Sequence, residues 1–145
     1  MPSKRKYTVY VVVFKGDPVD FIKYRHTGLW FVPEDGGTQH YFHVTGLTGQ
    51  FQFESRKGFD PTKSRTFAKK VKVGKIKLSL TSSEIGNLLE SVSVNNYDLE
   101  FNCQQWVQDA LSILLDAGYI NEEQYNNGLD GMTDAIAEAA DEDFA

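Results

Sequence analysis

The first half of the chain consists of short apolar runs separated by turn residues, a pattern that predicts an antiparallel β meander. The expected strands are residues 7–14, 26–32, 39–44, 50–55 and one or two strands within 66–79. The first run is β-branched or aromatic throughout, so we expect it to be buried on both faces. Residues 50–55 alternate strictly between polar and apolar side chains, as in a strand with one face in water. Pro33 and the Glu-Asp-Gly-Gly turn that follows it join the second and third strands as a hairpin.

The second half of the chain has the spacing of amphipathic helices. From Cys103 the apolar residues fall at positions 103, 106, 107, 110, 111, 114 and 115, so this helix has one face on a core. Asn102 is a good N-cap for it, and Gly118 is suited to end it in the left-handed conformation. Residues 81–84 form a capping-box pattern that opens an earlier helix, and residues 121–124 cap a short third one.

These elements predict a single α+β domain over residues 1–145, with an antiparallel β meander or small barrel packed against helices. The expected compact core covers about residues 7–128. Residues 129–145 are rich in alanine and acidic residues and contain no basic residue. They therefore either form a last helix or fray as an acidic tail, and we expect no function in them.

Charge is divided unevenly along the chain, whose net charge is −5. All 15 lysines and arginines lie between Lys4 and Lys77, whereas 14 of the 20 acidic residues follow position 80. A basic face for nucleic acid is one interpretation. We favour attraction between the two halves, because the basic residues are scattered among strands and do not form a phosphate-tracking cluster. We therefore expect no nucleic-acid partner.

The sequence favours a cytoplasmic location. The single cysteine excludes an internal disulfide, and the basic residues 4–6 are not followed by a signal-peptide pattern. The apolar run of residues 9–14 is far too short to cross a bilayer. We expect no membrane partner.

Cys103 stands where a nucleophilic thiol is expected. The first turn of a helix has unpaired backbone N–H groups and the positive end of the macrodipole, and both favour the thiolate. Cys103 also lies on the apolar stripe of its helix, and free cysteine is among the residues most often buried. A plain packing role is therefore the alternative, and the placement of the histidines decides between the two.

The chain has three histidines, at His26, His40 and His43. Residues of equal parity share a face of a strand, so His40 and His43 point to opposite sides. If residues 26–32 and 39–44 pair as a hairpin, His26 and His43 lie near each other on one face. Two histidines three residues apart diverge on a strand, so we expect no metal site, and no cofactor is implied.

Three ordered motifs carry a resemblance to a known group of enzymes. They are residues 24–30 (Tyr-Arg-His-Thr-Gly-Leu-Trp), 39–44 (Gln-His-Tyr-Phe-His-Val) and 97–107 (Tyr-Asp-Leu-Glu-Phe-Asn-Cys-Gln-Gln-Trp-Val). This order resembles the circularly permuted papain-like (NlpC-type) thiol enzymes, in the branch of the PPPDE peptidases and the lecithin:retinol acyltransferase-like enzymes. The chain is also similar to a set of small fungal proteins with an Asn-Cys-Gln segment, which suggests no substrate.

The resemblance spans roughly residues 7–115 and implies a permuted papain-like fold with a Cys-His pair. His26 matches the catalytic histidine of the group, Cys103 its nucleophile and His43 the second histidine of the acyltransferase branch. The implied activity is cysteine-dependent acyl transfer by a thiol hydrolase (a peptidase or amidase) or an acyltransferase, on a peptide, isopeptide or small-molecule amide or ester. The expected supporting residues, which include those near the oxyanion, are Asn102, Gln104 and Tyr24.

A non-catalytic module that binds a peptide or small ligand on the same fold is the alternative function. Trp30, Phe51 and Phe53 would line its groove, although core packing is the favoured role for these residues. A further alternative is a protein- or nucleic-acid-interaction module that uses the basic half. Reactivity of the thiol distinguishes the enzyme from both.

Overall fold

The computed structural model describes residues 4–16, 20, 25–98 and 101–139, and its central element is an open antiparallel sheet. The strands are β1 (Tyr7–Phe14), β2 (His26–Pro33), β3 (His40–Thr45), β4 (Gln52–Lys57) and β5 (Phe67–Lys75). Their order is β4-β3-β2-β1-β5, so β1 to β4 form the predicted meander and β5 pairs with the free edge of β1. The edge strands β4 and β5 lie at opposite sides of the sheet. The alternative of a small barrel is therefore wrong, because a barrel would enclose the apolar face that the helices cover here.

Three helices, α1 (Ser82–Glu90), α2 (Cys103–Asp116) and α3 (Glu122–Ala137), follow the sheet, and the 3₁₀ turn η2 (Pro61–Lys63) precedes β5. Thr81 and Glu84 form the predicted capping box of α1. Asn102 caps α2, and its side chain accepts from the backbone N–H of Gln105 at 3.0 Å. Gly118, with a φ of 82°, follows α2 in the left-handed conformation, as predicted. Local capping chemistry therefore sets these helix ends.

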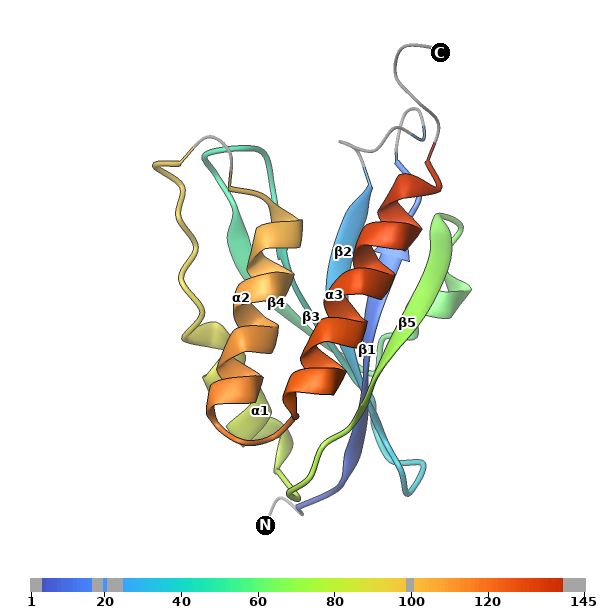
Figure 1. Cartoon of the computed structure of the whole chain (residues 1–145), viewed down its shortest axis with the longest axis vertical. Helices are drawn as coiled ribbons and strands as arrows, with labels where there is room; N and C mark the ends of the chain where they lie inside the picture. The colour runs from blue at the N-terminus through green and yellow to red at the C-terminus, as the bar shows by residue number, and fades with distance from the viewer. Residues whose placement is uncertain (1–3, 17–19, 21–24, 99–100, 140–145) are drawn as a thin grey trace.

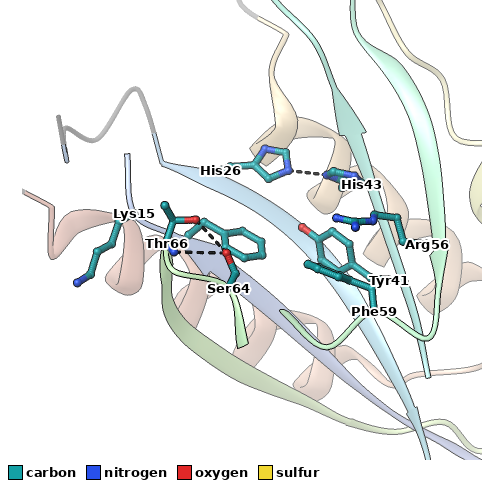
Figure 2. Close-up of a pocket in the computed structure, with 9 residues that line it drawn as sticks. Lys15, His26, Tyr41, His43, Arg56, Phe59, Ser64 and Thr66 are labelled. Carbon is teal, nitrogen blue, oxygen red and sulfur yellow. Dashed lines mark hydrogen bonds between the residues drawn. The ribbon is translucent and has the colours of Figure 1, made fainter. Parts of the chain in front are cut away.

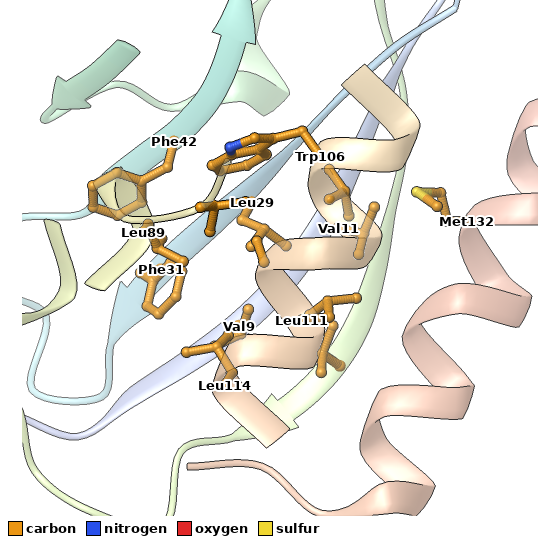
Figure 3. Packing of buried hydrophobic residues seen from close by; sticks show 14 of the residues in the cluster. Val9, Val11, Leu29, Phe31, Phe42, Leu89, Trp106, Leu111, Leu114 and Met132 are labelled. Carbon is orange, nitrogen blue, oxygen red and sulfur yellow. The ribbon is translucent and has the colours of Figure 1, made fainter. Parts of the chain in front are cut away.

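The helices cover one face of the sheet and bury a continuous apolar core against it (Figure 1). The centre of this core contains Val9, Val11, Leu29, Phe31, Phe42, Leu89, Trp106, Leu111 and Leu114 (Figure 3). A smaller apolar cluster on the opposite face contains Val12, Phe14, Trp30 and Tyr41, with Phe59 and Phe67 packed against it. Residues of opposite parity in β1 enter the two clusters, so β1 is buried on both faces, as predicted.

The core continues past residue 128, where the sequence pattern placed its end. Residues 122–137 form one long helix, and Met132, Ala135 and Ile136 of its second half are buried. Of the two alternatives for the residues after 128, the structure shows a helix as far as Ala137, but this helix is continuous with the one predicted from residue 121 and belongs to the core. The apolar pattern is weak here because two of the four buried residues of α3, Gly128 and Ala135, have little or no side chain.

The segment 66–79 contains one strand, β5, rather than two. Its register against β1 shifts next to Gly74, which has a φ of 147° and so adopts a conformation that favours glycine. The predicted interruption at Gly74 is thus a β-bulge near the end of a single strand. Beyond it, Leu80 forms an isolated bridge with Arg5.

The charge asymmetry of the sequence becomes a separation between layers. The three α-helices contain no lysine or arginine, and the described basic residues lie on strands, loops and η2. Among the described residues, two ion pairs join the basic half to the acidic half: Lys4–Glu84 at 4.0 Å and Lys69–Glu138 at 3.2 Å. Both are exposed and contribute little to stability, so the predicted attraction between the halves is weak. None of the described helices has the length and apolarity needed to cross a membrane.

Two glycines of α3 allow this helix to lie close to β5. A Cβ atom added at Gly131 would collide with Cγ1 of Val71, and one at Gly128 would lie 3.0 Å from Cγ2 of Val73. Gly86 of α1 differs, because the nearest atom to an added Cβ is Cε1 of Phe42 at 4.0 Å. Alanine therefore has room at Gly86 and none at Gly131.

We expect Gly131→Ala and Gly86→Ala to change stability in opposite directions. Alanine favours a helix interior over glycine, so Gly86→Ala should raise the free energy of unfolding by roughly 0.5–1 kcal/mol. At Gly131 the overlap with Val71 should outweigh this gain and lower the free energy of unfolding by about 1–3 kcal/mol. Urea unfolding of both variants measures the difference. A more stable Gly131→Ala variant would contradict the close packing of α3 on β5.

Candidate active site

His26 and His43 meet at one end of the sheet, as their parity predicted. His26 is the first residue of β2, and His43 follows Phe42, which pairs with Leu29 of β2. The ring centroids are 4.9 Å apart, and Nε2 of His26 lies 2.6 Å from Nδ1 of His43 (Figure 2). His40 has the opposite parity and stacks on Phe42 on the helix-covered side of the sheet. The structure therefore brings together the two histidines that the sequence singled out.

Glu54 of β4 extends this contact into a hydrogen-bonded chain. β3 and β4 pair His43 directly with Glu54, and Nε2 of His43 lies 2.7 Å from Oε1 of Glu54. This hydrogen bond is the main reason that the pKa of Glu54 is lowered. Glu54 is therefore a carboxylate at neutral pH and can only accept, so Nε2 of His43 carries the donated hydrogen.

The tautomers of both rings follow from this constraint. Burial is the largest cause that lowers the pKa of His26, to about 4, and burial also lowers the pKa of His43. Both imidazoles are therefore neutral at pH 7, and each has a single N–H. Since Nε2 of His43 donates to Glu54, Nδ1 of His43 must accept from Nε2 of His26. Nδ1 of His26 is left with a free lone pair and can act as a base.

The ring nitrogens of the two histidines are largely engaged by protein partners. His26 and His43 each direct one ring nitrogen at the other, and Glu54 occupies the second nitrogen of His43. Within the part of the chain that the structure describes, no group of three His, Cys, Asp or Glu side chains is arranged to hold a metal ion.

Cys103 is the first residue of α2, and its thiol faces the backbone at the start of β2. Its sulfur lies 3.9 Å from the carbonyl oxygen of Arg25, to which the thiol donates. Burial raises the pKa of Cys103 above its ordinary value, against the opposing effects of Thr27 and of the backbone amides of Cys103 and Gln104. The predicted preference for the thiolate is therefore wrong for the resting protein, because desolvation outweighs the amides of the helix N-terminus.

Thr27 places an unpaired donor beside this thiol. Thr27 is fully buried, and its Oγ1 has no hydrogen-bond partner among the described residues. A buried hydroxyl without a partner costs free energy. Both the amide and the hydroxyl of Thr27 act to lower the pKa of Cys103. Thr27 thus stabilises the charged form of the sulfur once the proton has left.

Cys103 and His26 line one cavity of about 420 Å³. The other residues of its wall include Arg25, Gly46, Leu47, Thr48, Phe51 and Asn102. No hydrogen bond joins Cys103 to His26 among those that the described residues form. The structure therefore brings the predicted nucleophile and base to a common space, with the thiol hydrogen directed at Arg25.

Arg25 fixes the backbone that lies against the thiol. Its guanidinium is buried and contacts both carboxylate oxygens of Asp20, at 2.8 and 2.7 Å. Nη1 of Arg25 donates to the carbonyl oxygen of Ala135 in α3 at 2.7 Å. A two-point contact of this kind holds a guanidinium in one orientation. Arg25 therefore ties the start of β2, and with it His26, to the last turns of α3.

Two of the three predicted supporting residues are described. Asn102 caps α2 and lines the cavity that contains Cys103. The backbone amide of Gln104 acts on the sulfur, but its side chain lines a separate cavity beside Met132 of α3. Tyr24 lies outside the described residues.

Three residues of the site, Glu54, Thr27 and Tyr41, are not indicated as site residues by the sequence pattern. Glu54 lies beside His43 on the same face of the sheet because of the register of β3 against β4, and no local sequence pattern reports that register. Thr27 is next to His26 in sequence but faces the opposite side of β2. The hydroxyl of Tyr41 is buried, has no hydrogen-bond partner among the residues that the structure describes, and lies across Gly28, where an added Cβ would collide with it. Gly28, in the His-Thr-Gly motif, is the feature of the sequence that indicates the close approach of Tyr41 to β2.

Comparison with known proteins assigns the chain to a family without assigning an activity. None of the curated proteins and none of the solved structures compared with the chain matches it significantly. The model of one family matches residues 9–121, which include most of β1, the other four strands, α1, α2, Cys103 and the two paired histidines. The protein therefore belongs to DUF6540, a family of unknown function.

Proposed function

We propose that the protein is a cysteine-dependent acyl-transfer enzyme with a permuted papain-like fold, in which Cys103 is the nucleophile and His26 the general base. The observation that supports this most is the hydrogen-bonded chain from Glu54 through His43 to His26, because it leaves a lone pair on Nδ1 of His26. A general base for a thiol needs a neutral ring whose tautomer is held by a third group. His43 and Glu54 meet that need. The proposal includes a cytoplasmic location and no nucleic-acid or membrane partner.

The reaction begins when Nδ1 of His26 takes the thiol proton of Cys103 and the sulfur attacks the carbonyl carbon of an amide or ester. The oxyanion formed is held by the first-turn amides of α2, including that of Cys103, which have no acceptor within the helix. Collapse of this intermediate breaks the bond to the leaving group, which receives the proton from His26. Water or an amine then attacks the thioester, and Cys103 regains its proton. The substrate class is a peptide, an isopeptide or a small-molecule amide or ester.

The pKa directions favour a neutral Cys103–His26 pair in the resting enzyme. Burial raises the pKa of Cys103 and lowers that of His26 to about 4, so the proton stays on the sulfur until substrate arrives. The thiol hydrogen must then turn from Arg25 toward His26. Proton transfer is thus coupled to the attack on the carbonyl, and Thr27 stabilises the sulfur as its charge develops.

A non-catalytic binding module on the same fold is the second candidate, and the raised pKa of Cys103 is the observation that favours it. In that case the cavity beside Cys103 holds a peptide or small ligand with no covalent step. A buried cysteine whose pKa is raised is usually inert. Covalent labelling separates the two candidates.

Incubation with p-nitrophenyl acetate should acetylate Cys103 of the folded protein. Peptide mapping by mass spectrometry should place the acetyl group on Cys103, and Cys103→Ala should remain unlabelled. His26→Ala should release p-nitrophenolate about 10²–10⁴-fold more slowly, because the general base is lost. His40→Gln is the matched control and should retain the rate of acylation, since His40 lies on the face of the sheet opposite to His26 and His43. A folded wild-type protein that is not acetylated, although its thiol reacts after unfolding, would leave only the binding module.

As the pH is lowered, the acylation rate should fall with an apparent pKa near 4, the value expected for His26. The base form of His26 carries the reaction, so the rate should be half-maximal near pH 4 and level at neutral pH. Stopped-flow measurement of p-nitrophenolate release between pH 3.5 and 8 gives this profile. A midpoint near 6.5, the ordinary value for histidine, would show that His26 is not the buried neutral base described here.

Unfolding must be measured over the same range, because stability should also fall as the pH drops from about 6.5 to about 4. The pKa of His26 is lower in the folded protein than in the unfolded chain, so the unfolded chain binds more protons in this window. The contribution of neutral His26 to the stability of the folded protein is complete above pH 6.5 and decreases toward pH 4. Circular dichroism at each pH distinguishes lost structure from a protonated base.

Glu54→Gln should reduce acylation by at least about tenfold without changing the fold. The amide of glutamine can donate to Nε2 of His43, which moves the hydrogen of His43 to Nδ1 and that of His26 to Nδ1 as well. Imidazole ¹⁵N spectra should then show protonated Nδ1 of His26 in the variant and protonated Nε2 in the wild type. Glu54→Asp should restore part of the rate, and Glu90→Gln, at an exposed position of α1, should have no effect. Unchanged ¹⁵N spectra in Glu54→Gln would contradict the positioning role of Glu54.

A further inference from the structure

A second cavity, of about 310 Å³, lies on the sheet face that the helices leave uncovered (Figure 2). His26 lines both this cavity and the one that contains Cys103, so the two spaces meet at its ring. The volume is at the lower end of the range for cavities that hold small organic ligands. The mechanism proposed above uses none of the residues that surround this space apart from the two histidines.

Aromatic rings form much of the wall. The ring of Tyr41 lies 5.3 Å from that of Phe59 and 6.0 Å from that of Phe14, measured between centroids. The ring of Phe14 in turn stacks at 6.0 Å on His26. These rings come from four separate segments of the chain: β1, β2, β3 and the loop before η2. Tyr41 and Phe14 are buried, whereas Phe59 is half-buried and offers an apolar surface to a planar ligand.

Arg56 supplies a cation at the edge of these rings. Its guanidinium carbon lies 3.9 Å from the centroid of Phe59, and Figure 2 shows the side chain beside Tyr41 and His43. Among the described residues Arg56 forms no ion pair within 4.0 Å, although its charge also acts on the carboxylate of Glu54 on the same strand and lowers the pKa of Glu54. A guanidinium stacked by its face keeps its N–H edge free for a carboxylate or phosphate.

Further polar groups face the same space. The hydroxyl of Tyr41 is buried and has no hydrogen-bond partner among the described residues, so it is an unused donor in the cavity wall. The hydroxyls of Ser64 and Thr66 line the cavity as well and lie 3.2 Å apart. Lys15 is at the rim, and in Figure 2 its ammonium group extends away from the rings. Arg56 is therefore the main anion-binding group.

We propose that this cavity binds a small aromatic anion, an aryl phosphate or aryl carboxylate. The ring of the ligand packs against Phe59, and its anionic group accepts hydrogen bonds from the guanidinium of Arg56. Recognition needs no covalent step and no thiol, so it is independent of the chemistry proposed for Cys103. Both the ring and the charge are required, because neither the aromatic wall nor the single arginine is a complete site.

Isothermal titration calorimetry with phenyl phosphate and with benzoate tests this proposal on the full chain. At least one of them should bind with a Kd of about 1 mM or tighter, as expected for a ligand of this size. Phenol and inorganic phosphate, which carry only the ring or only the charge, should each bind at least about tenfold more weakly. Backbone amide shifts should change at Tyr41 and His43 when phenyl phosphate or benzoate is added. Absence of binding by both aromatic anions would overturn the proposal.

Substitutions locate the site and separate it from general charge attraction. Arg56→Gln should weaken binding at least tenfold, and Arg56→Lys should also weaken it because lysine cannot form the two-point contact. Lys77→Gln removes the same charge at an exposed position outside the cavity and should leave binding unchanged. Equal losses of affinity in Arg56→Gln and Lys77→Gln would show that binding depends only on general charge attraction and would overturn the proposal. Cys103→Ala should bind normally, so the result stands apart from that of the acylation experiment.

Discussion

The hydrogen-bonded chain from Glu54 through His43 to His26 exists only if β2, β3 and β4 pair in one register. A slip of one residue would turn every side chain of a strand to the opposite face of the sheet. The same register places Leu29 and Phe42 opposite each other under the helices. The polar chain on one face and the apolar core on the other are therefore consequences of a single set of strand pairings. Burial of large apolar side chains holds this register, because a slipped strand would expose them to water.

The position of Cys103 reflects a competition between two physical effects. The N-terminus of α2 supplies amides that favour a thiolate, while the packing of α2 on β2 removes water from the sulfur. Desolvation is the larger effect in the resting protein. Arg25 links the start of β2 to α3 through the bond of its side chain to Ala135, while its carbonyl oxygen accepts from the thiol of Cys103. The chemistry of the thiol consequently depends on a helix that follows it in the sequence.

His26 occupies a boundary between two cavities, and this placement gives its ring two kinds of neighbour. One side shares a space with Cys103, and the other shares a space with aromatic rings and Arg56. Its neutral state depends on burial between them. The ring of His26 is therefore part of the wall of both cavities.

The sequence by itself determined the local features of this protein. The strands β1 to β4, the caps at Thr81, Asn102 and Asn121, and the shared face of His26 and His43 all follow from side-chain parity and capping chemistry, which depend on near neighbours in the chain. Only the tertiary structure decided that Glu54 completes the histidine chain, that burial raises the pKa of Cys103, and that α3 belongs to the core. Each of these depends on strand register, desolvation or close packing between segments far apart in the sequence. No local pattern reports such contacts, because the partner segments are brought together only when the whole sheet and its helices assemble.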